Sequence, residues 1–172
     1  MAILLLVAGL PGSGKSFFAD RLADAIGATP INSDRVRILM HARGKYAIDD
    51  KFAVYHRMAL EAGNLLRNGT DVIVDATFYL KSLRDLFFRI GTEHNARIYL
   101  IEIQADEEII KKRISVDRVL SEADFSVFKK IKGEYEAIAD PHLILRSSDD
   151  NIEQMIAQTR AYLELKEKEH ER

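Results

Sequence analysis

The sequence predicts a three-layer α/β fold, in which a parallel β-sheet lies between two layers of helices. Two observations lead to this prediction. Short aliphatic segments alternate with stretches of helical periodicity along the chain, and the first aliphatic segment runs directly into a glycine-rich motif. Such alternation builds right-handed β-α-β units with parallel strands. Because the chain has 172 residues and no internal repeat or linker, we expect one domain over residues 1–172.

The individual strands and helices follow from side-chain spacing. Short aliphatic segments, most with β-branched residues, predict five strands at 3–7, 29–32, 72–74, 97–103 and 142–145. Helical spacing of apolar residues, with turn residues at the ends, predicts helices at 17–26, 49–66, 81–94, 107–116 and 124–139. Asp49 or Asp50 is expected to cap the second of these helices. Ser148 is expected to cap a final helix, which ends in a charged tail at 166–172.

The composition is that of a globular protein and excludes several classes of function. Hydrophobic residues make up 47% and charged residues 30%, and the net charge of −2 provides no overall positive field for nucleic acid. Segment 3–7 is too short to span a membrane and has no basic flank, so we expect no membrane association. The chain has no cysteine, which excludes disulfides and thiolate metal sites and fits a cytoplasmic location.

The segment from Gly9 to Ser16 matches the phosphate-binding motif G-x-x-x-x-G-K-[ST]. Its glycines allow the backbone N–H groups to surround the β-phosphate of a nucleotide, and a helix beginning near Lys15 adds its positive end. Lys15 can reach the β- and γ-phosphates, and the Ser16 hydroxyl can bind Mg²⁺. The expected nucleotide contacts are Gly9, Leu10, Pro11, Gly12, Ser13, Gly14, Lys15, Ser16 and Phe17. The motif therefore predicts a P-loop NTPase fold with ATP and Mg²⁺ as its cofactors.

Two acidic residues follow predicted strands and should lie beside this loop, because ligands bind at the carboxyl ends of parallel strands. Asp75 ends the aliphatic run 72–74, so it is either a ligand of Mg²⁺ beside Ser16 or an exposed helix or loop cap. Asp34 follows the strand at 29–32, with Arg37 three residues later. Asp34 can accept the proton of a hydroxyl acceptor while Arg37 holds an anionic group of that acceptor. The alternative is an N-cap with a weak ion pair.

Basic residues after the fourth predicted strand are candidates for a lid over the nucleotide. Arg113 and Arg118 flank a break in helical order, and a short helical lid at about 113–124 can bring them to the γ-phosphate. The alternative is an exposed basic helix face. Ser147 and Ser148, after the last strand, are candidates to line the pocket of the nucleotide base.

Taken together, these motifs resemble the P-loop kinase family that contains the kinase domain of polynucleotide 5′-kinase, over residues 3–138. The glycine-rich loop is similar to that family's version, and segment 31–37 is similar to the segment with its general base and substrate arginine. The resemblance implies these roles for Asp34 and Arg37, and it implies lid roles for Arg113 and Arg118. Segment 74–77, followed by Arg84, resembles the family's third strand and trailing helix, and Arg84 is either a substrate contact or a surface residue.

The leading hypothesis is an ATP- and Mg²⁺-dependent kinase that phosphorylates a hydroxyl group of a polynucleotide 5′-end or a small metabolite. The family includes kinases of polynucleotide ends, of aminoacylated tRNA and of small metabolites, and toxins that phosphorylate sugar nucleotides. The basic stretch at 35–45 either attracts a phosphorylated or nucleic-acid acceptor or is an ordinary charged helix face. The alternatives are a slow ATP-hydrolysing switch or scaffold, which needs no Asp34 and Arg37 pair, and a nucleic-acid-binding module.

Overall fold

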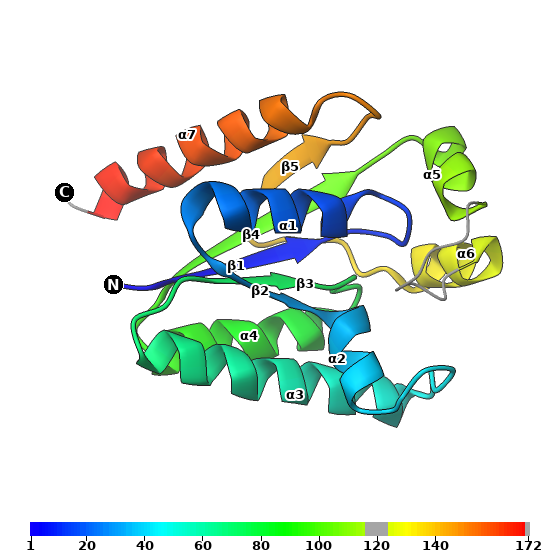
Figure 1. Ribbon diagram of the computed structural model, residues 1–172, viewed down its shortest axis with the longest axis horizontal. Coiled ribbons are helices and arrows are strands. Elements are labelled where there is room, and N and C mark those ends of the chain that lie inside the picture. Colours follow the sequence, from blue (N-terminus) through cyan, green and yellow to red (C-terminus); the bar gives the residue numbers. More distant parts are fainter. Residues whose placement is uncertain (116–123, 171–172) are drawn as a thin grey trace.

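The predicted α/β architecture is confirmed by a computed structural model, which describes residues 1–115 and 124–170. Its strands are β1 Ile3–Ala8, β2 Thr29–Asn32, β3 Val72–Asp75, β4 Arg97–Gln104 and β5 Leu143–Arg146. They form one five-stranded sheet in the order β2-β3-β1-β4-β5, with every neighbouring pair parallel (Figure 1). β1 therefore lies at the centre of the sheet, where the strand order changes direction. Ligands bind at such switch points.

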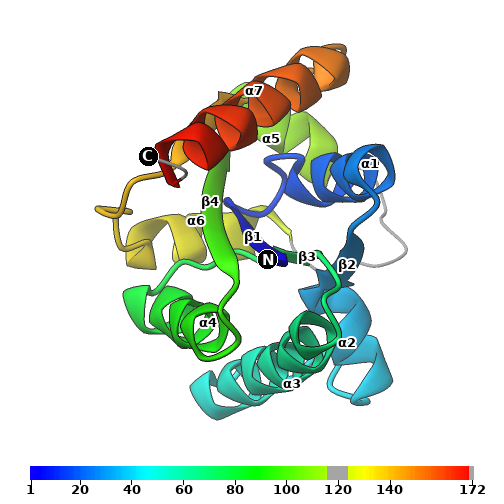
Figure 2. The same ribbon diagram turned by 90° about the vertical axis from the view of Figure 1, so that its left-hand side faces the viewer.

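Helices cover both faces of this sheet. They are α1 Lys15–Ile26, α2 Ser33–Leu39, α3 Ile48–Arg67, α4 Lys81–Glu93, α5 Glu107–Ile114, α6 Phe125–Glu134 and α7 Ile152–His170. α1 and α7 lie on one face, while α3 and α4 lie on the other (Figures 1 and 2). α5 and α6 lie beyond the end of the sheet toward which β1 points (Figure 1). Within the described ranges, no helix is both long and apolar enough to cross a membrane.

The central strand is buried on both sides because its neighbours and both helix layers exclude water. Leu4 and Leu6 belong to the core that α3 and α4 cover, and Leu5 and Val7 belong to the core under α1 and α7. This division follows from the two-residue period of a strand, which sends successive side chains to opposite faces. A strand covered on both faces reads as a continuous apolar run, which explains the pattern of segment 3–7.

Two predicted helix caps are wrong. α3 begins at Ile48 after Ala47, so Asp49 and Asp50 lie in its first turn, where acids favour the helix dipole. α7 begins at Ile152 rather than beside Ser148. The intervening turn is closed by Asn151, whose side chain accepts from the Ser148 amide at 2.9 Å and donates to the Arg146 carbonyl at 2.7 Å.

α6 also ends earlier than its sequence pattern predicts, at Glu134 rather than 139. Tyr135 is extended, and the backbone N–H of Glu136 donates to the carbonyl of Tyr79 at 2.8 Å. The chain thus leaves the helix to bond with the segment that follows β3. This is a tertiary contact that local spacing does not indicate.

Arg84 on α4 is neither a surface residue nor a residue of the candidate pockets described below. Its side chain is buried, with 1% of the residue exposed. The guanidinium donates to the Phe78 carbonyl at 2.7 Å and to the Ala137 carbonyl at 3.4 Å. Arg84 therefore ties the segment after β3 to the segment after α6, and its role in this structure is to hold two loops together.

Replacing Arg84 by Met should lower the free energy of unfolding by about 2 kcal/mol, because two backbone carbonyls lose a charged donor. Urea denaturation measures this change. Arg89→Met is the matched control, since Arg89 is exposed on the same helix, and it should change stability by less than about 0.5 kcal/mol. Equal stabilities of the two variants would contradict a structural role for Arg84.

Candidate active site

The glycine-rich loop joins β1 to α1, and its glycines are required by both conformation and space. Gly12 and Gly14 have φ angles of +81° and +93°, which side chains rarely adopt. A Cβ atom on Gly14 would also lie 2.8 Å from Ser147 Oγ and 3.0 Å from an Arg113 nitrogen. The first turn of α1 leaves N–H groups without intrahelical partners at the end of this loop. The loop and helix therefore offer the donors and positive dipole that an anion needs.

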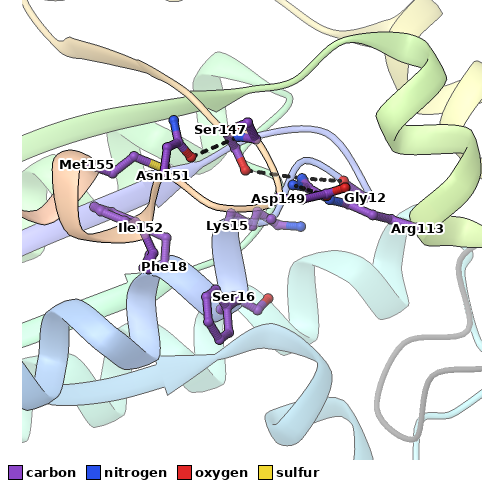
Figure 3. Close-up of a pocket in the computed structure, with 13 residues that line it drawn as sticks. Gly12, Lys15, Ser16, Phe18, Arg113, Ser147, Asp149, Asn151, Ile152 and Met155 are labelled. Atoms are coloured by element: carbon purple, nitrogen blue, oxygen red, sulfur yellow. Dashed lines mark hydrogen bonds and ion pairs between the residues drawn. The ribbon is translucent and has the colours of Figure 1, made fainter.

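A first pocket of about 520 Å³ lies between this loop, α1 and the segment that joins β5 to α7 (Figure 3). Its walls include Gly12, Gly14, Lys15, Ser16, Phe17, Phe18, Arg113, Ser147, Ser148, Asp149, Asn151, Ile152 and Met155. The predicted base-pocket residues Ser147 and Ser148 are thus on this wall. Phe17, 58% exposed, provides apolar surface, as do Ile152 and Met155. Apolar walls beside a phosphate loop can hold a nucleoside next to its phosphates.

Arg113 reaches from α5 to the glycine-rich loop and lies over the first pocket (Figure 3). Its guanidinium donates to the Ser13 carbonyl at 3.1 Å and to Ser147 Oγ at 3.1 Å. It also forms an ion pair with Asp149 at 3.3 Å, and the positive charges of Lys112 and Arg113 lower the pKa of Asp149. Arg113 therefore joins the loop to the β5–α7 segment. Arg118 and most of the predicted lid lie outside the described residues.

A second pocket of about 210 Å³ opens on the other side of the loop. Asp34 and Arg37, both predicted to act on an acceptor, line it. Gly12, Lys15 and Ser16 line both pockets. The glycine-rich loop and the first residues of α1 therefore form a wall that both pockets share. Asp34 and Arg37 line the second pocket, and the apolar side chains line the first.

Strand register creates a polar corner beside Ser16. Asn32 and Asp75 are opposite each other in the pairing of β2 with β3, and the Asn32 amide donates to Asp75 Oδ2 at 2.5 Å and to Ser16 Oγ at 3.3 Å. Asn32 Oδ1 accepts from the backbone N–H of Arg35 at 2.9 Å, so Asn32 caps α2. The interpretation of Asp34 as the N-cap is therefore wrong, because Asn32, two residues earlier, has that role.

Asp75 is buried, with 2% exposed, so its interpretation as an exposed cap is also wrong. Burial raises the pKa of this carboxyl, and the charge of Lys15 and hydrogen bonds from Ser16 and Asn32 oppose the rise. Oδ1 of Asp75 is buried and has no hydrogen-bond partner among the residues that the structure describes. An unsatisfied carboxylate oxygen beside a serine hydroxyl fits a Mg²⁺ ion, which commonly takes one or two carboxylates and keeps several waters.

Several residues of the second pocket were not predicted from the sequence. They are Tyr46, Lys51, Tyr55, Tyr79, Val127, Lys130 and Ile131. The four-residue spacing of Lys51 and Tyr55 places them on one face of α3, and the spacing of Val127, Lys130 and Ile131 places these three on one face of α6. That these two helix faces line the same pocket is decided by tertiary packing, which no local pattern indicates.

The predicted basic stretch at 35–45 is divided by the fold. Arg37 lines the second pocket, donates to the Lys45 carbonyl at 2.8 Å and stacks on the ring of Tyr46 at 4.6 Å. Arg35 instead forms an exposed ion pair with Asp20 at 2.9 Å. Of this stretch, Arg37 alone is a wall residue of the pocket, so the stretch does not act as one basic surface there.

Comparison with known proteins identifies a family and several relatives. A family described as an AAA domain matches residues 4–138. A probable adenylyl-sulfate kinase from Aeropyrum pernix is 26% identical over 162 residues, which cover 90% of this chain and 88% of the relative. The structure of the Mycobacterium tuberculosis APS kinase in complex with AMPPNP and APS has a TM-score of 0.72 at 20% identity. The match covers 95% of this chain and 98% of the APS kinase chain. A gluconokinase from Sinorhizobium meliloti has a TM-score of 0.67 at 18% identity, with 95% and 97% covered.

Replacing Asp75 by Asn should stabilise the metal-free protein at pH 7. Because burial raises the pKa of Asp75 above its ordinary value of 3.8, stability falls as the pH rises from 3.8 to the folded-state pKa, and the full cost of the ionised form is present above that pKa. This cost disappears below the ordinary value, so the advantage of the variant should shrink as the pH falls. Thermal denaturation in EDTA measures it, with Asp24→Asn on the exposed face of α1 as the control. A less stable variant at pH 7 would contradict the argument.

Proposed function

The chain belongs to the AAA domain family and is a P-loop kinase, and we propose that it transfers the γ-phosphoryl group of ATP to a hydroxyl group of a small anionic molecule. The observation that carries this proposal is the shared wall of the two pockets. Gly12, Lys15 and Ser16 border both, so a triphosphate in the first pocket would present its terminal group to the second. Phosphoryl transfer requires such an in-line arrangement of donor and acceptor.

The relatives support a small acceptor. The enzymes named above carry adenylyl-sulfate kinase, APS kinase and gluconokinase in their descriptions, and none of these three descriptions names a polynucleotide. The volume of the second pocket, about 210 Å³, lies below the roughly 300–1,000 Å³ of typical ligand pockets, which favours a small acceptor over a polynucleotide. A polynucleotide 5′-end therefore has no specific support as the acceptor.

The charges of the second pocket support an anionic acceptor. Arg37, Lys51 and Lys130 line this pocket together with Lys15, whereas Asp34 is the single acid on its wall among the residues that the structure describes. The ammonium of Lys51 donates to the hydroxyl of Tyr79 at 3.3 Å and lies 4.9 Å from the ring centre of Tyr79. Because Tyr79 is a neutral partner, these contacts do not neutralise the positive charge of Lys51. Cations grouped around one acid attract an anion and hold it by charge-assisted hydrogen bonds.

We assign the chemical steps to residues of the two pockets. Lys15 and the loop N–H groups hold the phosphates, and Arg37 holds the anionic group of the acceptor. Asp34 accepts the proton of the acceptor hydroxyl while that oxygen bonds to the γ-phosphorus and the bond from phosphorus to the β-phosphate oxygen breaks. Ser16 and Asp75 would hold Mg²⁺, which neutralises phosphate charge when bound. Phosphate contacts by Arg113 and Arg118 stay predictions.

Replacing Asp34 by Asn should reduce turnover by about 10²- to 10⁴-fold, because the proton acceptor is lost. Affinity for AMPPNP, measured by calorimetry, should be unchanged, since Asp34 lies outside the first pocket. Turnover is measured as ATP consumption with adenylyl sulfate, gluconate and a 5′-hydroxyl oligonucleotide as acceptors. A switch protein would consume ATP at the same rate with and without each acceptor, and full activity of the variant would contradict the role of Asp34.

Replacing Lys130 by Met should raise the KM for the anionic acceptor by about tenfold, the effect of losing roughly 1.4 kcal/mol of binding. Lys129→Met is the matched control, because Lys129 precedes Lys130 on α6 but is not a wall residue of the second pocket. The ammonium of Lys129 lies 5.0 Å from the ring centre of Phe125 instead. KM values for ATP should be the same in both variants. Equal acceptor KM values for Lys129→Met and Lys130→Met would contradict an anionic acceptor held by α6.

A further inference from the structure

Thr77 is held in a fixed position between the sheet and the glycine-rich loop. It lies two residues after Asp75, and its carbonyl accepts a hydrogen bond from the Gly9 amide at 3.3 Å. Its side chain is partly exposed and lines the second pocket together with Asp34 and Lys15. Thr77 is therefore a wall residue of the space where an acceptor would bind, on a backbone that is anchored to the phosphate loop.

The Thr77 hydroxyl also contacts a buried tyrosine. Tyr55 Oη lies 3.2 Å from Thr77 Oγ1, and the backbone N–H of Phe78 donates to the same Tyr55 oxygen at 3.1 Å. Because the phenol oxygen already accepts from Phe78, its own hydrogen is available to Thr77. The distance is compatible with either direction, but the reverse one would leave the Tyr55 hydrogen without a partner among the described residues, on a side chain that is only 4% exposed. We therefore assign Tyr55 as the donor and Thr77 as the acceptor.

The surroundings of Tyr55 favour its role as the hydrogen-bond donor to Thr77. Burial raises the pKa of Tyr55 to about 12, so the phenol keeps its hydrogen throughout the neutral range. The ring packs edge-on against Phe78 and Phe87, with centroids 5.5 Å and 6.4 Å away, which restricts its rotation. A hydroxyl that accepts from Tyr55 directs its own hydrogen away from Tyr55, and Thr77 is a wall residue of the second pocket.

We infer that Thr77 donates a hydrogen bond to the oxygen that attacks the γ-phosphate in the acceptor pocket, and that Tyr55 is the positioning residue that orients Thr77. Asp34 would accept the proton of that oxygen while Thr77 donates to one of its lone pairs, so the two side chains fix its direction. The bonds made and broken are those of the proposed transfer, and Thr77 itself gains and loses no proton. This inference rests on the proposed kinase function.

The test uses water as the acceptor, so it does not depend on knowing the natural substrate. Slow hydrolysis of ATP by the whole protein is measured for wild type, Thr77→Val and Thr77→Ser. Thr77→Val should lower kcat by about three- to tenfold with an unchanged KM for ATP, because one hydrogen bond to the attacking oxygen is lost. Thr77→Ser keeps the hydroxyl and should stay within about twofold of wild type. Equal kcat values for wild type and Thr77→Val would overturn the inference.

Tyr55→Phe separates orientation from a general structural effect. The variant should lower kcat by a smaller factor than Thr77→Val, and the double variant should match Thr77→Val alone, because Tyr55 acts through Thr77. A double variant whose loss is the product of the two single losses would overturn the role of Tyr55. Failure of the kinase proposal is distinguishable, since ATP consumption by wild type would then be the same with and without each acceptor.

Discussion

The parallel pairing of β1 with β3 and of β3 with β2 is the constraint on which the site depends. This register places Val7 opposite Asp75 and Asn32 opposite Asp75, and the Ala76 amide donates to the Val7 carbonyl at 3.2 Å. Three strand ends are therefore aligned at one edge of the sheet. A shift of one residue in any of these pairings would turn the side chains of that strand to the opposite face. The phosphate loop, the α2 cap and the buried carboxylate are consequently fixed relative to one another.

The same alignment explains why the charged form of Asp75 is energetically unfavourable in this site. Asp75 is buried among the strand ends, where the loss of hydration disfavours its charge, and its raised pKa reflects this cost. The compensating groups come from different elements: Lys15 from α1, and Asn32 from the end of β2. A divalent cation at the unsatisfied oxygen would offset the remaining cost. The fold thus keeps a destabilised carboxylate at the place where phosphate chemistry requires one.

The chain pattern was sufficient to predict a parallel sheet, because a continuous aliphatic run is a local property of a strand that is covered on both faces. The glycine-rich loop and its helix were predicted from residue types at fixed spacing, and Asp34, Arg37 and Asp75 were located from their positions after strands. Arg84 could not be assigned this way, since its partners lie at Phe78 and Ala137, and the second of these is far along the chain. Asn32 was missed as a cap because the neighbouring Ser33 and Asp34 have the same local preference.

The sequence by itself determined the succession of strands and helices along the chain, the nucleotide loop and the acids that follow the strands. Each of these depends on neighbours within a few residues. The tertiary structure decided which basic residues face the acceptor, that Arg113 bonds to the loop backbone, and that Tyr55 orients Thr77. These depend on contacts between α3, α5, α6 and the strand ends. Such contacts are set by packing across the sheet edge, and no local pattern of residues encodes them.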